Sequence, residues 1–161
     1  MTDNQSVNFG STHEDTASSD EILKLDNQLC FALYVCSKEI IRKYKPLLEP
    51  LSLTYTGYIT MLALWEKDNV TVKELGQRLT LDSGTLTPLL KKLETLTYVE
   101  RIRSSDDERS VFVRLTDNGR ALKREAAHVP EQMICSVNIE RQKAIHLWGA
   151  LHELMNHLSI E

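Results

Sequence analysis

The N-terminal third of the chain carries one long helical pattern of apolar residues. Apolar side chains recur there at three- and four-residue steps, which is typical of one face of a helix: Leu29, Leu33, Cys36, Ile40 and Tyr44. The run Ser18-Ser19-Asp20-Glu21 matches a capping box and predicts the start of this helix. Cys30 would then lie several residues past the cap. Lys45-Pro46 and Glu49-Pro50 predict the end of the helix. Residues 1–18 are polar and predict a disordered tail.

The middle of the chain contains a helical pattern followed by a strand pattern. Helices are predicted over residues 54–66 and 71–79, and a third helix begins after a polar turn near Asp82. Residues 98–103 and 110–115 predict two strands, because alternation places three apolar residues on one face: Val111, Val113 and Leu115. Helix, turn, helix and a charged hairpin is the order of a winged helix-turn-helix. We therefore expect a mainly α fold with a small β wing that binds double-stranded DNA.

The C-terminal region predicts further helices. Thr116-Asp117 caps a helix that reaches Val129, where Pro130 starts, bends or breaks a turn. A final amphipathic helix is indicated by a stripe of apolar side chains: Ala144, Trp148, Leu151, Met155 and Leu158.

The apolar stripes of the two terminal helical regions must be buried somewhere. They either pack on the DNA-binding unit within one chain or pair across a two-fold axis in a homodimer. We favour the dimer, because one winged helix offers few contacts for specific DNA and symmetric readers bind palindromic operators. The expected domains are a tail (1–18), an N-terminal dimerisation helix (19–50), the winged helix-turn-helix (51–116) and C-terminal dimerisation helices (117–161).

The third helix of the motif contains Pro88, a residue that is tolerated only in the first turn of a regular helix. The helix therefore starts late, near Gly84-Thr85, or bends at Pro88. Either way its N-terminal end carries the residues expected to face the DNA groove: Asp82, Ser83, Thr85, Thr87 and Pro88. Lys91 and Lys92 follow where a phosphate backbone would run. The alternative is an exposed polar cap on an ordinary helix.

The net charge of the chain, −4, is unusual for a DNA-binding protein. The acidic residues are concentrated in the first 28 positions, whereas the balance over residues 71–124 is basic. Charges more than about 8 Å apart are largely screened at physiological salt, so a locally positive face is sufficient.

Several classes of protein are disfavoured by the sequence. The longest apolar runs, such as residues 61–65, are too short to span a membrane, and no secretory signal is expected. Three cysteines without a CxxC pair argue against a disulfide scaffold or a structural zinc site and indicate a cytoplasmic protein. His152 and His157 are five residues apart, so they cannot share a metal on one helix. We expect no metal, no cofactor and no enzymatic activity.

Three segments resemble the MarR family of transcriptional regulators, and more narrowly its organic-hydroperoxide-sensing, OhrR-type branch. They are residues 81–91 (LDSGTLTPLLK), residues 106–116 around DDERSV, and residues 25–55, which include LDNQLCF and YKPLL. The resemblance covers about residues 24 to 130.

The resemblance implies roles for individual residues. Cys30 matches the peroxide-reactive cysteine of this branch, and Tyr44 and Tyr55 match tyrosines that hydrogen-bond its sulfur from the partner subunit; Tyr34 lies beside them. Arg109 matches the arginine at the wing tip that enters the minor groove, and Asp107 matches the acid that braces it. Thr56-Gly57 replaces the more usual Pro-Gln after Tyr55, which implies a looser edge of the pocket.

The cysteines differ in what they can do. Cys30 and Cys36 would lie about 120° apart around one helix and about 9 Å along it, which no disulfide tolerates. The resemblance implies a two-cysteine mechanism instead, in which Cys135 forms a disulfide with Cys30 across the dimer. Cys36 is expected to be structural.

Two regulatory hypotheses follow. In the first, the protein is a repressor that releases its operator when an organic hydroperoxide oxidises Cys30. In the alternative, a phenolic or other small ligand in the dimer cleft causes release and the cysteines are structural. A thiol-peroxidase-like enzyme is a distant third possibility.

Overall fold

The computed structural model describes residues 19–104 and 110–158. The expected tail (1–18), which includes Ser18 of the capping box, and the expected wing-tip residues Asp107 and Arg109 lie outside the described residues. The chain divides into two units, the first ending at Arg42 and the second beginning at Lys43.

The first unit does not begin with one long helix. A short helix α1 (Ser19–Ile22) and a 3-10 turn η1 (Leu25–Asn27) precede α2, which begins at Leu29 and ends at Leu48 in the second unit. The backbone is extended at Gln28, and the Gln28 side-chain amide donates to the carbonyls of Ile22 (2.7 Å) and Lys24 (3.2 Å). Such side-chain bonds to the backbone compete with the helical ladder. The prediction of one helix from residue 19 is therefore wrong, and Pro46 lies inside α2 rather than ending it.

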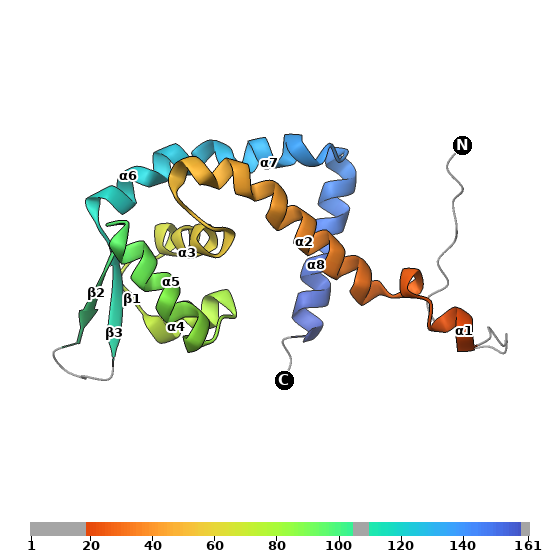
Figure 1. The fold of residues 1–161 in the computed structure, drawn as a ribbon, viewed down its shortest axis with the longest axis horizontal. Coiled ribbons are helices and arrows are strands. Elements are labelled where there is room, and N and C mark those ends of the chain that lie inside the picture. The colour runs from red at the N-terminus through yellow and green to blue at the C-terminus, as the bar shows by residue number, and fades with distance from the viewer. Residues whose placement is uncertain (1–18, 105–109, 159–161) are drawn as a thin grey trace. The chain divides into compact units, whose positions relative to one another are not determined.

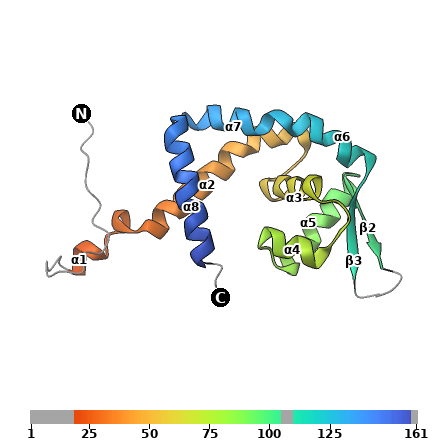
Figure 2. The same cartoon turned by 180° about the vertical axis from the view of Figure 1, so that it is seen from behind.

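The second unit contains the winged helix-turn-helix that the pattern predicted (Figures 1 and 2). After a 3-10 turn η2 (Glu49–Leu51), the helices are α3 (Tyr55–Glu66), α4 (Val72–Leu79) and α5 (Ser83–Thr95). The strands are β1 (Val70–Thr71), β2 (Val99–Arg103) and β3 (Val111–Leu115), in the order β1-β3-β2 and antiparallel. The sheet has one more strand than expected, because β1 pairs with β3 in the register Val70↔Val113.

Side-chain caps fix where these helices begin. Thr54 accepts from the Gly57 amide at the start of α3, and Thr71 forms a reciprocal capping box with Glu74 at the start of α4. Each such cap satisfies backbone N–H groups that have no partner within the helix. The boundaries of α3 and α4 predicted from the sequence are therefore confirmed to within a residue.

Three further segments complete the second unit. Thr116 caps α6 (Asp117–Glu125), as predicted, but α6 ends before Val129, and a 3-10 turn η3 (Ala126–His128) leads into α7 (Val129–Val137). Pro130 lies in the first turn of α7, where its missing N–H costs no hydrogen bond. The last helix is α8 (Arg141–Leu158).

Most of the buried core lies in the winged helix-turn-helix and in the adjoining α6, η3 and α7. The ends of the described chain are different, because α8 has no buried residue and its Trp148 side chain is 63% exposed. Large apolar side chains are also exposed in the first unit: Ile22, Leu23, Leu25, Leu29, Tyr34, Val35, Ile40 and Ile41. No helix of the described chain is long and apolar enough to cross a membrane.

Candidate nucleic-acid interface and sensor residues

Helix α5 has one face in the core and the opposite face in solvent. Leu86, Leu90 and Leu93 are each 1% exposed and recur at the four- and three-residue steps of a helix face. The opposite face carries the residues that the sequence predicted to contact DNA, and all are exposed: Asp82, Ser83, Thr85, Thr87, Pro88, Lys91 and Lys92. The leucines thus determine which side of α5 is presented.

Asp82 is the N-cap of α5. Its carboxylate accepts from the Thr85 amide (2.9 Å) and from the Thr85 hydroxyl (2.9 Å). These hydrogen bonds, first the one from the Thr85 backbone, lower the pKa of Asp82, because they favour its charged form. The polar tip of α5 is therefore held in one shape by a charge-assisted cap, and the contacts of Asp82 and Thr85 with DNA stay a prediction.

Pro88 is the sixth residue of α5, because the helix already begins at Ser83. The expected late start near Gly84-Thr85 is wrong by one residue, and the proline lies beyond the first turn. Its ring cannot donate the N–H that a regular helix would direct to the Gly84 carbonyl. One acceptor near the exposed tip of α5 is thereby left without its helical donor.

Some of the positively charged side chains in the winged helix-turn-helix form ion pairs with carboxylates and others do not. Arg101 binds Glu94 (2.7 Å), Arg114 binds Glu100 (2.7 Å) and Arg78 binds Glu66 (2.9 Å). The Arg101 guanidinium lowers the pKa of Glu94, so this pair stays ionised. Three other cations form no ion pair with any carboxylate of residues 19–104 and 110–158: Lys91, Lys92 and Arg103. Those charges can be directed at phosphates.

Two of the three predicted sensor tyrosines meet in the second unit. The ring centroids of Tyr44 and Tyr55 are 4.9 Å apart, a distance typical of packed aromatic pairs. Burial, and then the neighbouring phenols of Tyr55 and Tyr58, raise the pKa of Tyr44. The Tyr44 hydroxyl therefore stays protonated at neutral pH and can act as a hydrogen-bond donor.

Tyr58 belongs to the same cluster and was missed by the sequence analysis. Its ring centroid lies 5.9 Å from that of Tyr44, and its side chain is only 2% exposed. Burial is the main cause of its raised pKa. The available signal was its position three residues after Tyr55 on a predicted helix, since such residues are neighbours on one face.

Cys30 and Tyr34 lie in the first unit. Cys30 is exposed and is the second residue of α2, so the expectation that it lies several residues past the cap is wrong. The cause is the break at Gln28, which places Cys30 in the first turn, where backbone N–H groups favour anions. Tyr34 is 59% exposed, and the Lys38 ammonium lies 3.5 Å from its hydroxyl and 5.5 Å from its ring centroid.

The other two cysteines are also free and exposed. Cys36 is on α2, six residues from Cys30, which is the separation that rules out a disulfide between them. Cys135 is on α7, where the neighbouring Ser136 carbonyl accepts from the Lys43 ammonium (3.0 Å). Pairing of Cys30 with Cys135 stays a prediction.

The two histidines of α8, His152 and His157, are five residues apart on that helix. His152 stacks on Trp148 with ring centroids 3.9 Å apart, and its Nδ1 lies 2.9 Å from the Trp148 carbonyl. In the part of the chain that the structure describes, no three potential metal ligands gather.

Comparison with known proteins identifies the relatives of the chain. Residues 42–126 match the family model "Transcriptional regulator SarA/Rot". The organic hydroperoxide resistance transcriptional regulator of Bacillus subtilis is 44% identical over 136 residues, which cover 84% of this chain and 92% of that protein. The regulator SarZ of Staphylococcus saprophyticus is 46% identical over 132 residues, which cover 82% of this chain and 90% of SarZ.

AbfR of Staphylococcus epidermidis is a similar protein of known structure. Reduced AbfR bound to DNA has a TM-score of 0.71 and 32% identity, covering 88% of this chain and 99% of AbfR. The disulfide-formed AbfR structure has a TM-score of 0.59 and 36% identity, covering 85% of this chain and 96% of AbfR.

Proposed function

Because the chain belongs to the MarR family of transcriptional regulators, alongside the Bacillus organic hydroperoxide resistance regulator, we propose that it is a redox-sensing DNA-binding repressor. In its reduced form the protein binds a palindromic operator as a homodimer. An organic hydroperoxide oxidises Cys30, and the oxidised protein releases the operator.

The observation that carries the DNA-binding part of the proposal is the two-sided character of α5. Its leucine face is fixed in the core, while the capped polar tip, Lys91 and Lys92 face outward, and no carboxylate of the described residues forms an ion pair with these two lysines. A helix of this kind fits the major groove, with the polar tip toward base edges and the lysines toward phosphates. The related AbfR binds DNA in its reduced form.

The dimer accounts for the exposed apolar side chains at both ends of the described chain. Trp148 on α8 is 63% exposed and Leu29 on α2 is 49% exposed, and several similar residues lie near each. Apolar patches of this extent mark sites of association. A second copy of the chain covers them and supplies the two-fold symmetry that a palindromic operator requires.

The sensing chemistry begins at the Cys30 sulfur. The Cys30 thiolate attacks the terminal oxygen of the hydroperoxide, the O–O bond breaks, and the alkoxide takes up a proton and leaves as an alcohol. The sulfur becomes a sulfenic acid. Tyr44 and Tyr55 supply O–H donors for the sulfur from the partner subunit, as the family resemblance implies.

A second cysteine then converts the sulfenic acid into a stable product. The Cys135 thiolate of the partner attacks the oxidised sulfur, a disulfide forms as the S–O bond breaks, and the departing hydroxide takes up a proton from solvent to become water. The disulfide holds its two sulfurs about 2 Å apart and therefore ties α2 of one protomer to α7 of the other. We expect this link to change the spacing of the two α5 helices in the dimer and so to spoil the fit to successive major grooves. AbfR has been solved in a disulfide-formed state.

The direct test is retention of DNA before and after oxidation. A duplex is first selected from random sequences with the reduced protein, and retention is measured with and without cumene hydroperoxide. The proposal expects retention by the reduced protein, loss on treatment and recovery with dithiothreitol. Release by a phenolic ligand instead, with no response to hydroperoxide, would favour ligand control.

A further inference from the structure

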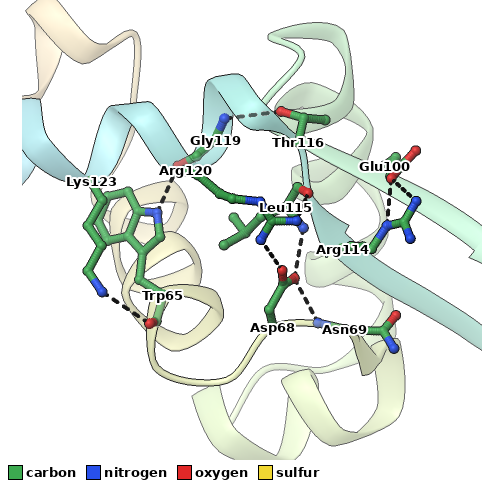
Figure 3. Close-up of polar contacts among 10 residues, drawn as sticks. All are labelled: Trp65, Asp68, Asn69, Glu100, Arg114, Leu115, Thr116, Gly119, Arg120 and Lys123. Carbon is green, nitrogen blue, oxygen red and sulfur yellow. Dashed lines mark hydrogen bonds and ion pairs between the residues drawn. The ribbon is translucent and has the colours of Figure 1, made fainter.

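One carboxylate joins three elements of the second unit at the base of the hairpin formed by β2 and β3. Asp68, just after α3, accepts from the amide of Leu115, the last residue of β3 (2.8 Å), and from the amide of Asn69 (2.7 Å). Its other oxygen binds the guanidinium of Arg120 in the first turns of α6. Arg120 in turn donates to the Leu115 carbonyl (2.9 Å), which closes a ring of three residues (Figure 3).

A second set of bonds lies beside this ring and joins α3 to α6. The Trp65 indole donates to the Gly119 carbonyl (2.9 Å), and the Lys123 ammonium donates to the Trp65 carbonyl (3.3 Å) (Figure 3). Gly119 packs directly against the backbone of Tyr98, the residue before β2. A Cβ atom at position 119 would lie 2.0 Å from the Tyr98 carbonyl oxygen. The first turn of α6 is therefore held against both α3 and the start of β2.

The electrostatics of Asp68 support a fixed, ionised link. Partial burial raises the pKa of Asp68, but the bonds from Leu115, Arg120 and Asn69 together outweigh it and hold the pKa below its usual value. The carboxylate is only partly exposed, with a side-chain exposure of 28%. A charge-assisted bond in such a setting has a more defined geometry than a surface ion pair.

We infer that Asp68 and Arg120 are positioning residues for operator binding, which fix the angle of the β2–β3 hairpin relative to α5. Helix α5 is attached to the core by its leucines, and β3 is held by the buried Val113 and Leu115 and by its pairing with β1. The bonds of Asp68 and Arg120 at Leu115 add a polar link at the end of β3, which restricts the angle that the hairpin can take. This inference rests on the proposed DNA-binding function.

Removing the charge of Asp68 distinguishes a charge effect from a positioning effect, because the two predict opposite changes in DNA affinity. If only net charge mattered, Asp68→Asn would remove an acid near the DNA and tighten binding. If the ring positions the hairpin, the same change weakens binding by about tenfold, the equivalent of one charge-assisted hydrogen bond. Affinity of the reduced full-length protein is measured by fluorescence anisotropy on the duplex that the parent selects, with hydroxyl-radical footprinting of the same complexes.

The expected results also include a pattern that a merely structural role would not give. Asp68→Asn and Arg120→Gln should lose protection at the flanks of the footprint and keep it at the centre, and the double variant should be no weaker than either single variant. Arg120→Lys keeps the charge but cannot bridge both partners, so it should be weakened as well. Glu66→Gln, which removes a nearby exposed acid paired with Arg78, is the control and should bind as tightly as the parent or more tightly.

Three outcomes overturn the inference: Asp68→Asn binds as tightly as the parent, the two single effects add, or protection falls evenly along the footprint. An even fall that follows the unfolded fraction in a thermal melt also counts against it. A parent protein that selects no duplex refutes the proposed function itself, and this inference with it.

Discussion

The ring of Tyr44 lies 4.9 Å from that of Tyr55, with the two ring planes inclined by 48°. Both residues come from sequence segments that the family resemblance assigned to the sensor, and the fold brings their rings together. The Tyr58 ring centroid lies 5.9 Å from that of Tyr44, so the orientation of Tyr44 is restricted by two neighbouring rings.

The first prediction concerns the hydroxyls of this cluster. Tyr55→Phe keeps the ring contact and removes one O–H donor, so Cys30 should react with cumene hydroperoxide about tenfold more slowly, the equivalent of one hydrogen bond to a charged group. DNA affinity of the reduced protein should not change. Tyr98→Phe removes a phenol that donates to the Leu51 carbonyl (3.1 Å) and is the control. The reaction rate is measured as the loss of free thiol over time. Equal rates for Tyr55→Phe and the parent would show that Tyr55 is not part of the sensor.

The second prediction concerns phosphate contacts by α5. Lys92→Ala should weaken DNA binding similarly for different sequences and reduce the slope of log affinity against log salt by about 0.9, the contribution of one phosphate contact. Lys143→Ala on α8 removes a lysine that lies 3.6 Å from Glu140 and should leave the slope unchanged. Anisotropy titrations at four salt concentrations measure both. An unchanged slope for Lys92→Ala would place Lys92 away from the DNA backbone.

The third prediction concerns the cap of α5 and pH. The pKa of Asp82 is lowered in the folded state, so this cap stabilises the protein above the pKa of an unfolded aspartate, about 3.9. The contribution is lost as the pH falls through the lowered value. Asn is an equally good cap without a titrating charge. Asp82→Asn should therefore melt like the parent at pH 7 but lose less stability between pH 4 and about pH 2. Parallel acid sensitivity of the two proteins would show that the cap makes no pH-dependent contribution.

The fourth prediction concerns the second cysteine. After hydroperoxide treatment, the parent and Cys36→Ser should run as covalent dimers on a non-reducing gel. Cys135→Ser should run as a monomer, since its partner sulfur is absent, and should recover DNA binding at a lower concentration of reductant. A covalent dimer that persists in Cys135→Ser would assign the crosslink to a different pair of sulfurs.

The winged helix-turn-helix was predictable because its signals are local. Thr54, Thr71 and Thr116 are caps that act over three residues, and the alternation of Val111, Val113 and Leu115 is visible in five residues of sequence. The short strand β1 was not predicted, because two residues carry no periodicity and pair only when β3 is present.

The features that sequence reasoning missed depend on contacts between distant or competing groups. The helix break before Cys30 depends on the Gln28 side chain, which competes with a capping signal that favoured an earlier start. Tyr58 lies on a helix that is apolar on most sides, so periodicity could not say which face it joins. Asp68 and Arg120 are 52 residues apart, and only the fold brings the two together.

The central claim is that oxidation of one sulfur controls DNA affinity, and the most direct measurement is the affinity of one protein sample carried through a redox cycle. The duplex selected by the reduced parent is titrated with parent and Cys30→Ser, first reduced, then treated with cumene hydroperoxide, then reduced again. We predict that both proteins bind the duplex equally when reduced. The treated parent should lose at least about a hundredfold in affinity, which is in the upper range of an allosteric coupling. Reductant should restore the affinity of the parent. Cys30→Ser should bind throughout. A treated parent that keeps its affinity, or a Cys30→Ser variant released at the same dose of hydroperoxide, would contradict the account.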